Sequence, residues 1–239
     1  MTPPKHASIR ILWWFWLAAV VLWIAVVLYP VSTTLTRLGS LILLAVIWAG
    51  LLWLTWSRIR LRIITVGVTL IAVAYALAPA RPVNSRTLTA EFIESLRRYQ
   101  GVRYVWGGES FLGIDCSGLM RRGLIDAMAL RGLRTFDGGM IRSAFSLWWH
   151  DQTAGELGDA RSGVTTGRFK TESINATEPS RLLPGDLAAN EVHILAYLGG
   201  NEWIEADPDA GKVVVVSVPS QDVWFNKPMR IVRWSVLAR

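Results

Sequence analysis

Three residues in the C-terminal two thirds of the chain could together break an amide bond, beginning with a cysteine. Cys116 is the only cysteine among 239 residues and lies within the segment Gly113–Leu119 (GIDCSGL). It follows a glycine-rich turn and opens a predicted helix, where the partial positive charge of the helix N-terminus favours a thiolate. The sequence therefore predicts a nucleophilic cysteine with a lowered pKa.

A cysteine nucleophile needs a base and a group that orients the base. His193 is the best-placed histidine, because alternating apolar residues predict a strand over about 192–198 that contains it. Gly199-Gly200-Asn201 predicts a hairpin that sets Glu205 directly opposite His193 or within one residue of that place. We expect Glu205 to orient the imidazole, with Asp207, of the same strand parity, as the second candidate.

The other two histidines are weaker candidates. His6 precedes the first apolar segment, and His150 ends a predicted amphipathic helix, where a lone histidine is usually structural or at the surface. One cysteine and three histidines make a thiolate cluster or a histidine-rich metal site implausible. No metal and no cofactor are expected.

Charge divides the chain into two parts. Residues 1–80 contain no Asp or Glu, and all 18 acidic residues lie in 81–239. Of the net charge of +7, six charges come from residues 1–80, where they flank apolar runs instead of covering a folded surface, which argues against a nucleic-acid-binding domain. Seven of the 13 tryptophans also fall in the first 80 residues, as at membrane interfaces.

The basic first part predicts a membrane anchor of three helices, at about 11–30, 38–56 and 63–80. The third is the weakest and could instead lie at the interface. Lys and Arg in the short flanks favour a cytoplasmic N-terminus, so three spans place the rest of the chain in the periplasm or outside the cell. The spans lack ionisable side chains, which favours an anchor over a transporter.

After a linker at 81–87, residues 88–239 predict one α+β domain. Helices are expected from Thr87 or Thr89 to about Gln100, over 116–130 with Arg121 and Arg122 on the solvated face, and over 140–151. Strands are expected near 192–198, 202–206, 212–218 and 229–236. The polar stretch 152–180 is expected to be a disordered or passive insertion, or else a lid over the substrate.

The motifs of this domain resemble one family. Tyr-x-Trp-Gly-Gly at 104–108, Asp-Cys-Ser-Gly-Leu at 115–119, Leu-Pro-Gly-Asp-Leu at 183–187 and Val-His-Ile at 192–194 follow the order found in NlpC-type bacterial cell-wall cysteine peptidases, of the papain superfamily. The resemblance covers about 88–235. It implies a papain-like fold in which helices pack on an antiparallel sheet.

The resemblance also implies roles for residues. Cys116 would be the nucleophile and His193 the base, and the third catalytic position falls on Glu205, where the family usually has His, Asn or Gln. Tyr104 would contact the substrate or the oxyanion, and Asp115 and Ser117 would border the substrate site. The long stretch 152–180 and the helical anchor are further departures from the pattern.

The resulting hypothesis is a cysteine hydrolase in the bacterial cell membrane that cuts amide bonds in peptidoglycan stem peptides through a thioester. Its expected partners are those peptides and the lipid bilayer, and not nucleic acid. One alternative is an acyltransferase acting on lipid or lipoprotein with the same Cys–His pair. Another is a non-catalytic module that binds the cell wall.

Overall fold

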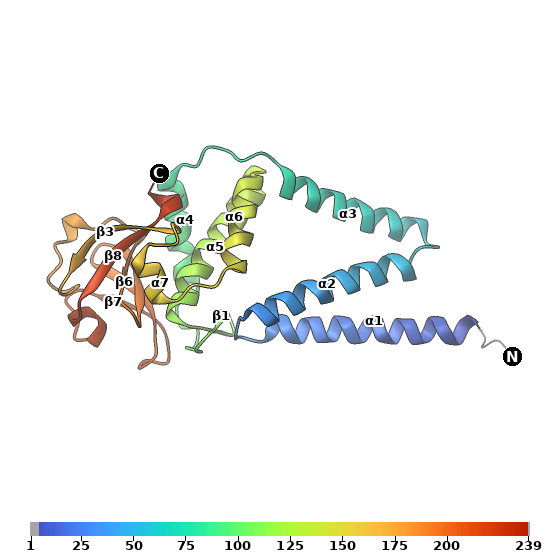
Figure 1. Ribbon diagram of the computed structural model, residues 1–239, viewed down its shortest axis with the longest axis horizontal. Helices are drawn as coiled ribbons and strands as arrows, with labels where there is room; N and C mark the ends of the chain where they lie inside the picture. Colours follow the sequence, from blue (N-terminus) through green and yellow to red (C-terminus); the bar gives the residue numbers. More distant parts are fainter. Residues whose placement is uncertain (1–4, 239) are drawn as a thin grey trace.

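The computed structural model describes residues 5–238, which form three long apolar helices and a separate α+β part (Figure 1). The helices are α1 (Lys5–Leu28), α2 (Thr34–Leu54) and α3 (Ile59–Leu77), and all three are long and apolar enough to cross a membrane. α1 and α2 lie side by side, whereas α3 diverges from them toward the α+β part.

Each apolar helix begins and ends a few residues before its predicted bounds of 11–30, 38–56 and 63–80. Thr33 is the reason for the early start of α2, because its hydroxyl accepts a hydrogen bond from the backbone N–H of Thr36 in a capping box. Hydropathy detects the apolar run but not this cap, so hydropathy alone predicts a later start for the helix.

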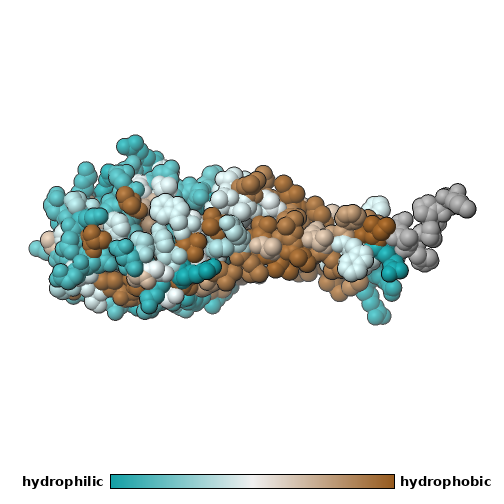
Figure 2. Space-filling view, turned by 90° about the horizontal axis from the view of Figure 1, so that it is seen from below, coloured by the Kyte–Doolittle hydropathy of each residue, from teal (hydrophilic) through white to brown (hydrophobic). Residues whose placement is uncertain are grey.

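The apolar helices expose their side chains. In Figure 2 their hydrophobic surface forms a continuous band, with hydrophilic surface on the α+β part at one end and at the far end of the helices. Soluble proteins rarely leave so large an apolar surface uncovered. The band is what a segment solvated by lipid would present.

The α+β part begins with four helices: α4 (Ser85–Arg98), α5 (Cys116–Thr135), α6 (Gly138–Trp149) and α7 (Ala154–Asp159). The side chain of Asn84 caps α4 by accepting from the N–H of Thr87, so this helix begins earlier than the predicted Thr87 or Thr89. The apolar stripe of α4, formed by Leu88, Phe92 and Leu96, is fully buried and packs in one core with α5.

An antiparallel sheet of six strands completes this part, in the order β3-β8-β4-β5-β6-β7. The strands are β3 (Thr165–Thr171), β4 (Asp186–Ala189), β5 (Ile194–Gly199), β6 (Glu202–Asp207), β7 (Lys212–Ser217) and β8 (Met229–Trp234). A small hairpin of β1 (Glu109–Ser110) and β2 (Gly113–Ile114) precedes α5. The α+β class is therefore the predicted one, with β3 and β4 added to the four expected strands.

The polar stretch 152–180 contains regular structure, contrary to the expectation of disorder. It forms α7 and then β3, which pairs with β8 at the edge of the sheet. The hydroxyl of Thr165 donates to the backbone oxygen of Leu157 over 2.5 Å and joins the two elements. The sequence did not predict β3, because an edge strand held mainly by backbone hydrogen bonds can have polar side chains and so lacks an alternating apolar pattern.

Both faces of the sheet are covered. Helices α4 and α5 pack on one face around residues such as Ile194, Ala196 and Ile204. The other face has a second core that includes Leu195, Trp203 and Phe225, the last from the short 3-10 helix η2 (Val223–Asn226). Further 3-10 turns are η1 (Pro179–Arg181) and η3 (Ser235–Leu237).

Candidate active site

Cys116 is the first residue of α5, and Asp115 caps that helix. One carboxylate oxygen of Asp115 accepts from the N–H of Gly118 at 2.6 Å, and the other accepts from the N–H of Gly107 at 2.8 Å. The cap therefore joins the start of the helix to the glycine turn before it. This pair of hydrogen bonds fixes the position of Cys116 relative to the turn.

Gly118 allows the turn to approach the helix. A Cβ atom at this position would lie 2.1 Å from the backbone oxygen of Gly108, far inside van der Waals contact. No side chain fits there without a backbone shift. The backbone of the Gly107-Gly108 turn therefore packs directly against the first turn of α5 at Gly118.

The Cys116 thiol is almost buried and lies 3.9 Å from the backbone oxygen of Val192, the residue before His193. Burial, followed by the charge of Asp115, raises the pKa of Cys116 to about 12. The backbone N–H groups of Ile194, Ser117 and Cys116 act in the opposite direction. The expected lowering of the thiol pKa is therefore wrong for this state, because desolvation outweighs the helix N-terminus.

His193 lies directly before β5, not within it as predicted. The side-chain oxygen of Asn190 accepts from the N–H groups of Val192 and His193 at 2.9 and 2.8 Å, and this turn holds the histidine backbone. The imidazole is buried and stacks on the indole of Trp224, with ring centroids 4.3 Å apart. Sequence reasoning singled out neither Asn190 nor Trp224, and only an Asx turn before the strand could have suggested the first.

Glu205 is the partner of His193. Its Oε2 lies 2.6 Å from Nε2 of the imidazole, whereas the carboxylate of Asp207 accepts from the N–H of Asp209. The hairpin pairs Ala196 with Ile204, whereas the predicted register pairs Ala196 with Glu202, two residues away. Extended along the strands, this register places Glu205 diagonally from His193 and not directly across from it.

The shifted register has a local cause. Gly199, Gly200 and Asn201 all adopt positive φ angles of 97°, 60° and 68°, and the pairing is irregular between Tyr197 and Gly199. Such a turn inserts a bulge that a symmetric two-residue hairpin lacks. Diagonal neighbours on one face remain within reach of long side chains, so the His193–Glu205 contact survives the shift.

The His193–Glu205 pair is buried, and this sets its protonation. Burial, followed by the charges of Asp222 and Asp207, raises the pKa of Glu205 to about 8. Burial lowers the pKa of His193 to about 4. Both directions favour an uncharged pair near neutral pH. Oε1 of Glu205 has no hydrogen-bond partner among residues 5–238, so the carboxyl group contacts His193 through Oε2 alone.

The remaining predicted site residues lie around the thiol. Ser117 donates its hydroxyl to Asp115 at 3.1 Å, and both line a cleft of about 680 Å³ that also contains Cys116. Tyr104 is half-buried, and burial, followed by the charges of Cys116 and Asp115, raises its pKa. The structure therefore gathers Tyr104, Asp115 and Ser117 about Cys116, and it holds Glu205 on His193.

The sequence profile of the NlpC/P60 family matches residues 101–233, which is more than half of the chain. The chain belongs to the NlpC/P60 family. The match begins just before Tyr104 and ends in β8, so it contains Cys116, His193 and Glu205 but none of the apolar helices. No curated protein is similar enough in sequence to be matched.

Solved structures of NlpC/P60 proteins resemble the chain. An NlpC/P60 family protein from Bacillus cereus is 16% identical, with a TM-score of 0.41 over 66% of this chain and 42% of that one. The peptidoglycan hydrolase RipB from Mycobacterium tuberculosis is 23% identical, with a TM-score of 0.40 over 64% of this chain and 66% of that one. A P60 domain from M. avium subspecies paratuberculosis is 23% identical, with a TM-score of 0.41 over 64% of this chain and 98% of that one. The chain thus spans less than two thirds of the length of the first two.

Arg121 is a residue of the NlpC/P60 cleft that sequence reasoning placed wrongly. It is 2% exposed, although it was expected on the solvated face of its helix. Its guanidinium pairs with Glu109 at 3.0 Å and with Asp151 at 2.5 Å, and it donates to the backbone oxygen of Leu147. Helical periodicity cannot predict this burial, because the residues that pair with Arg121 lie in segments before and after its own helix.

His150 does not line the cleft that contains Cys116. His150 follows α6, and its Nδ1 lies 2.9 Å from the backbone oxygen of Ser146. The side chain of His6 lies outside the described part of the structure. Within residues 5–238, no group of three or more His, Cys, Asp or Glu side chains is arranged to hold a metal ion.

Proposed function

We propose that this NlpC/P60 protein is a membrane-anchored cysteine peptidase that hydrolyses amide bonds in peptidoglycan stem peptides through a thioester. Membership of the family supports a cell-wall peptidase or amidase. The observation that carries the finer proposal is the contact between the start of α5 and the start of β5. In this contact the Cys116 thiol lies beside Val192, next to a histidine already bound to Glu205.

In the proposed reaction, His193 is the base. Glu205 occupies Nε2, so Nδ1 is the nitrogen left to accept the thiol proton of Cys116. The thiolate attacks the amide carbonyl carbon, and the imidazolium then protonates the departing amine to leave a thioester. His193 next takes a proton from water, whose oxygen attacks the thioester and releases the acid and the free thiol. Because burial raises the pKa of the Cys116 thiol, the thiol needs a neighbouring base to lose its proton.

Glu205 controls which nitrogen of His193 is free. An ionised Glu205 accepts from Nε2–H and leaves Nδ1 unprotonated, which is the tautomer needed for a base. A protonated Glu205 donates to Nε2 and moves the imidazole proton to Nδ1. Glu205 is therefore the proposed orienting residue. Tyr104 and the backbone N–H of Cys116 are the proposed oxyanion donors.

We further propose that α1, α2 and α3 all cross the membrane, with the N-terminus cytoplasmic. The start of α1 and the α2–α3 connection, which is flanked by Arg58, Arg60 and Arg62, lie at the end of the helices remote from the α+β part (Figure 1). The α1–α2 connection and the end of α3 lie at the other end. This arrangement supports a basic inner side and a catalytic part outside the cytoplasm.

Incubation with peptidoglycan fragments tests the function. The full chain in detergent or nanodiscs, and its Cys116→Ala variant, are each mixed with the fragments, and the products are identified by mass spectrometry. We expect new amine and carboxylate ends with the intact enzyme alone, and the fragment masses name the bond. Equal product from the Cys116→Ala variant, or none from either folded protein, would contradict the proposal. An acyl group retained on Cys116 from a lipid donor would favour acyl transfer.

A further inference from the structure

The connection between α1 and α2 is hydrogen-bonded to the glycine turn of the candidate active site. The N–H of Ser32 donates to the backbone oxygen of Gly107 at 2.8 Å, and the N–H of Glu109 donates to the oxygen of Pro30 at 3.1 Å. Val31 and Gly108 form an antiparallel bridge between these two bonds. Residues 30–32 therefore act as a short extra strand on the turn that precedes Cys116.

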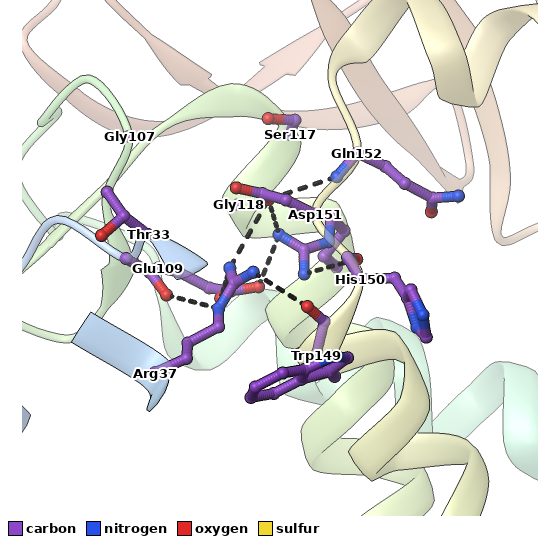
Figure 3. Close-up of polar contacts among 12 residues, drawn as sticks. Thr33, Arg37, Gly107, Glu109, Ser117, Gly118, Trp149, His150, Asp151 and Gln152 are labelled. Carbon is purple, nitrogen blue, oxygen red and sulfur yellow. Dashed lines mark hydrogen bonds and ion pairs between the residues drawn. The ribbon is translucent and has the colours of Figure 1, made fainter. Parts of the chain in front are cut away.

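Arg37, in the first turn of α2, extends this contact with its side chain. It is 2% exposed, and its Nη2 lies 3.0 Å from Oε2 of Glu109 and 3.5 Å from Oδ1 of Asp151. Its Nε donates to Ser32 at 2.9 Å. Its Nη1 donates to the backbone oxygen of Trp149 at 3.5 Å (Figure 3). A guanidinium on an apolar helix is thus held by Ser32 and by three residues of the catalytic part.

Arg37 and Arg121 share the same two carboxylates. Glu109 lies between them, with Oε2 toward Arg37 and Oε1 toward Arg121, each at 3.0 Å. Asp151, whose side chain is 56% exposed, contacts both arginines at the rim. Removing one arginine from such a buried group leaves the other charges without compensation, so the remaining side chains must rearrange.

This ion cluster (Arg37, Glu109, Arg121 and Asp151) is part of the cleft that holds the nucleophile. Ser32 and all four members of the ion cluster line that cleft together with Cys116. A short chain of contacts joins them, because Glu109 follows the turn whose Gly107 N–H is bound by Asp115, the cap before Cys116. A displacement of Glu109 is therefore transmitted to the backbone that sets the position of the thiol.

We propose that Arg37 is a positioning residue for the Cys116 site, and that the start of α2 is a wall of the substrate cleft. The cleft is complete only when the apolar helices are attached to the catalytic part. Because Arg37 immediately precedes the apolar run that begins at Leu38, the cleft lies at the level where α2 leaves the apolar band. With the proposed membrane anchoring, the peptide substrate enters at the bilayer surface.

Aromatic side chains beside the ion cluster support the placement of the cleft at the bilayer surface. Phe145, Trp148 and Trp149 of α6 pack together with ring centroids 5.6 to 6.4 Å apart, and Phe145 is 51% exposed. Trp106, on the cleft itself, is 75% exposed. Large aromatic residues of this kind gather at the headgroup level of a bilayer.

A second, separate contact provides the control. α3 attaches to the catalytic part through Arg142, which donates to the backbone oxygens of Ala76 and Ala78 at 2.6 and 3.0 Å. Tyr75 of α3 also packs edge-on against Phe136 at 4.5 Å. None of these residues lines the Cys116 cleft. An Arg142→Ala variant therefore loosens an apolar helix without changing a wall of the site.

The single cysteine makes the test direct, because thiol labelling reports on the cleft alone. The full chain and its Arg37→Ala, Arg37→Lys and Arg142→Ala variants are placed in nanodiscs and shown to be folded by circular dichroism. Iodoacetamide alkylation of Cys116 is then timed by mass spectrometry. We expect the rate to rise about fivefold or more in Arg37→Ala, less in Arg37→Lys, and less than about twofold in Arg142→Ala. Equal rates in folded Arg37→Ala and wild type would overturn the inference.

A second test measures cleavage kinetics and rests on the proposed function. It distinguishes a positioning role of Arg37 from a loss of stability. For stem-peptide cleavage we expect kcat/KM to fall about tenfold or more in Arg37→Ala, mainly through kcat, with partial rescue in Arg37→Lys. Unchanged kinetics in Arg37→Ala would refute a positioning role. If wild type cleaves nothing while Arg37→Ala still alkylates faster, the proposed function fails and the inference about the cleft stands. Should Arg37→Ala not fold, Arg37→Lys and Ser32→Ala, which removes only the Nε contact, take its place under the same criteria.

Discussion

At the scale of single residues, the site combines groups whose environments oppose their proposed roles. Cys116 stands at a helix N-terminus yet is desolvated, and His193 is held in the folded core by Glu205. Burial keeps the thiol and the carboxyl protonated and the imidazole neutral. The three proposed catalytic groups are therefore uncharged in the resting state, and activation requires proton transfer among them.

The first prediction concerns the pH dependence of activity. With a Glu205 pKa of about 8, kcat/KM of the wild type should rise as pH increases through 8, because ionised Glu205 frees Nδ1 of His193. In Glu205→Gln the amide oxygen accepts from Nε2–H at every pH, so this rise should disappear. Glu205→Ala should lose about 100-fold or more in kcat/KM. A rise near pH 8 that persists in Glu205→Gln would show that another group titrates.

The second prediction concerns stability. Glu205 ionises near 4.5 in the unfolded chain but near 8 in the folded chain, so the folded state binds the extra proton between these values. His193 acts oppositely below 6.5, its ordinary pKa, and its opposing slope fades above that value. Between about pH 6.5 and 8, the free energy of unfolding should therefore fall as pH rises.

Urea unfolding at pH 6.5 and 8 measures this slope, and Glu205→Gln is its control. The variant has no titrating carboxyl at this position, so its stability should change less than that of wild type between the two pH values. A steeper loss of stability in the variant would contradict the raised pKa of Glu205.

At the scale of elements, the start of α5 and the hairpin β5–β6 are the two parts that must meet. The first is fixed by Asp115, which binds both Gly107 and Gly118. The second is fixed by three successive residues with positive φ. Each depends on a glycine contact or a turn conformation, so a small backbone change at either should separate the thiol from the imidazole.

The third prediction tests the close contact at α5. Gly118→Ala should destabilise the fold by about 1–3 kcal/mol or more, because the new methyl group would meet the Gly108 oxygen at 2.1 Å. Gly167→Ala on β3 is the matched control, since no other residue lies within 4 Å of the place its methyl group would take, and it should change stability little. Chemical denaturation of both variants measures the difference. Equal stabilities of the two variants would mean that the Gly107-Gly108 turn moves away from the new methyl group without a loss of stability.

At the scale of the whole molecule, two of the three apolar helices dock on the catalytic part at different places. α2 meets the cleft through Arg37, and α3 meets α6 through Arg142. Because the two contacts lie apart, the catalytic part is held in one orientation relative to the apolar band and cannot rotate about a single linker. A peptide substrate would then approach from a fixed direction.

The fourth prediction concerns topology. With three spans and a cytoplasmic N-terminus, a reporter enzyme that folds only outside the cytoplasm should be active when fused after Arg239. The same reporter fused between α2 and α3 should be inactive. Activity of the second fusion alone would place the catalytic part in the cytoplasm and exclude the cell wall as its substrate.

Local sequence was sufficient for the motifs and the element types. The lone cysteine after glycines and the histidine at an alternating apolar run predicted a candidate nucleophile and a candidate base, and the acid-free first 80 residues predicted the three apolar helices. These features depend on residue type and short spacing, which sequence records directly. The α+β class followed for the same reason.

Only the tertiary structure decided the features that depend on distant residues. The pKa direction at Cys116 reversed because burial is a property of packing, and the diagonal His193–Glu205 contact depends on a bulged turn. The burial of Arg121 and its ion cluster with Arg37 join segments far apart in the chain. Ion pairs between residues far apart in the sequence produce no periodic pattern. Each partner, taken alone, looks like an ordinary charged surface residue.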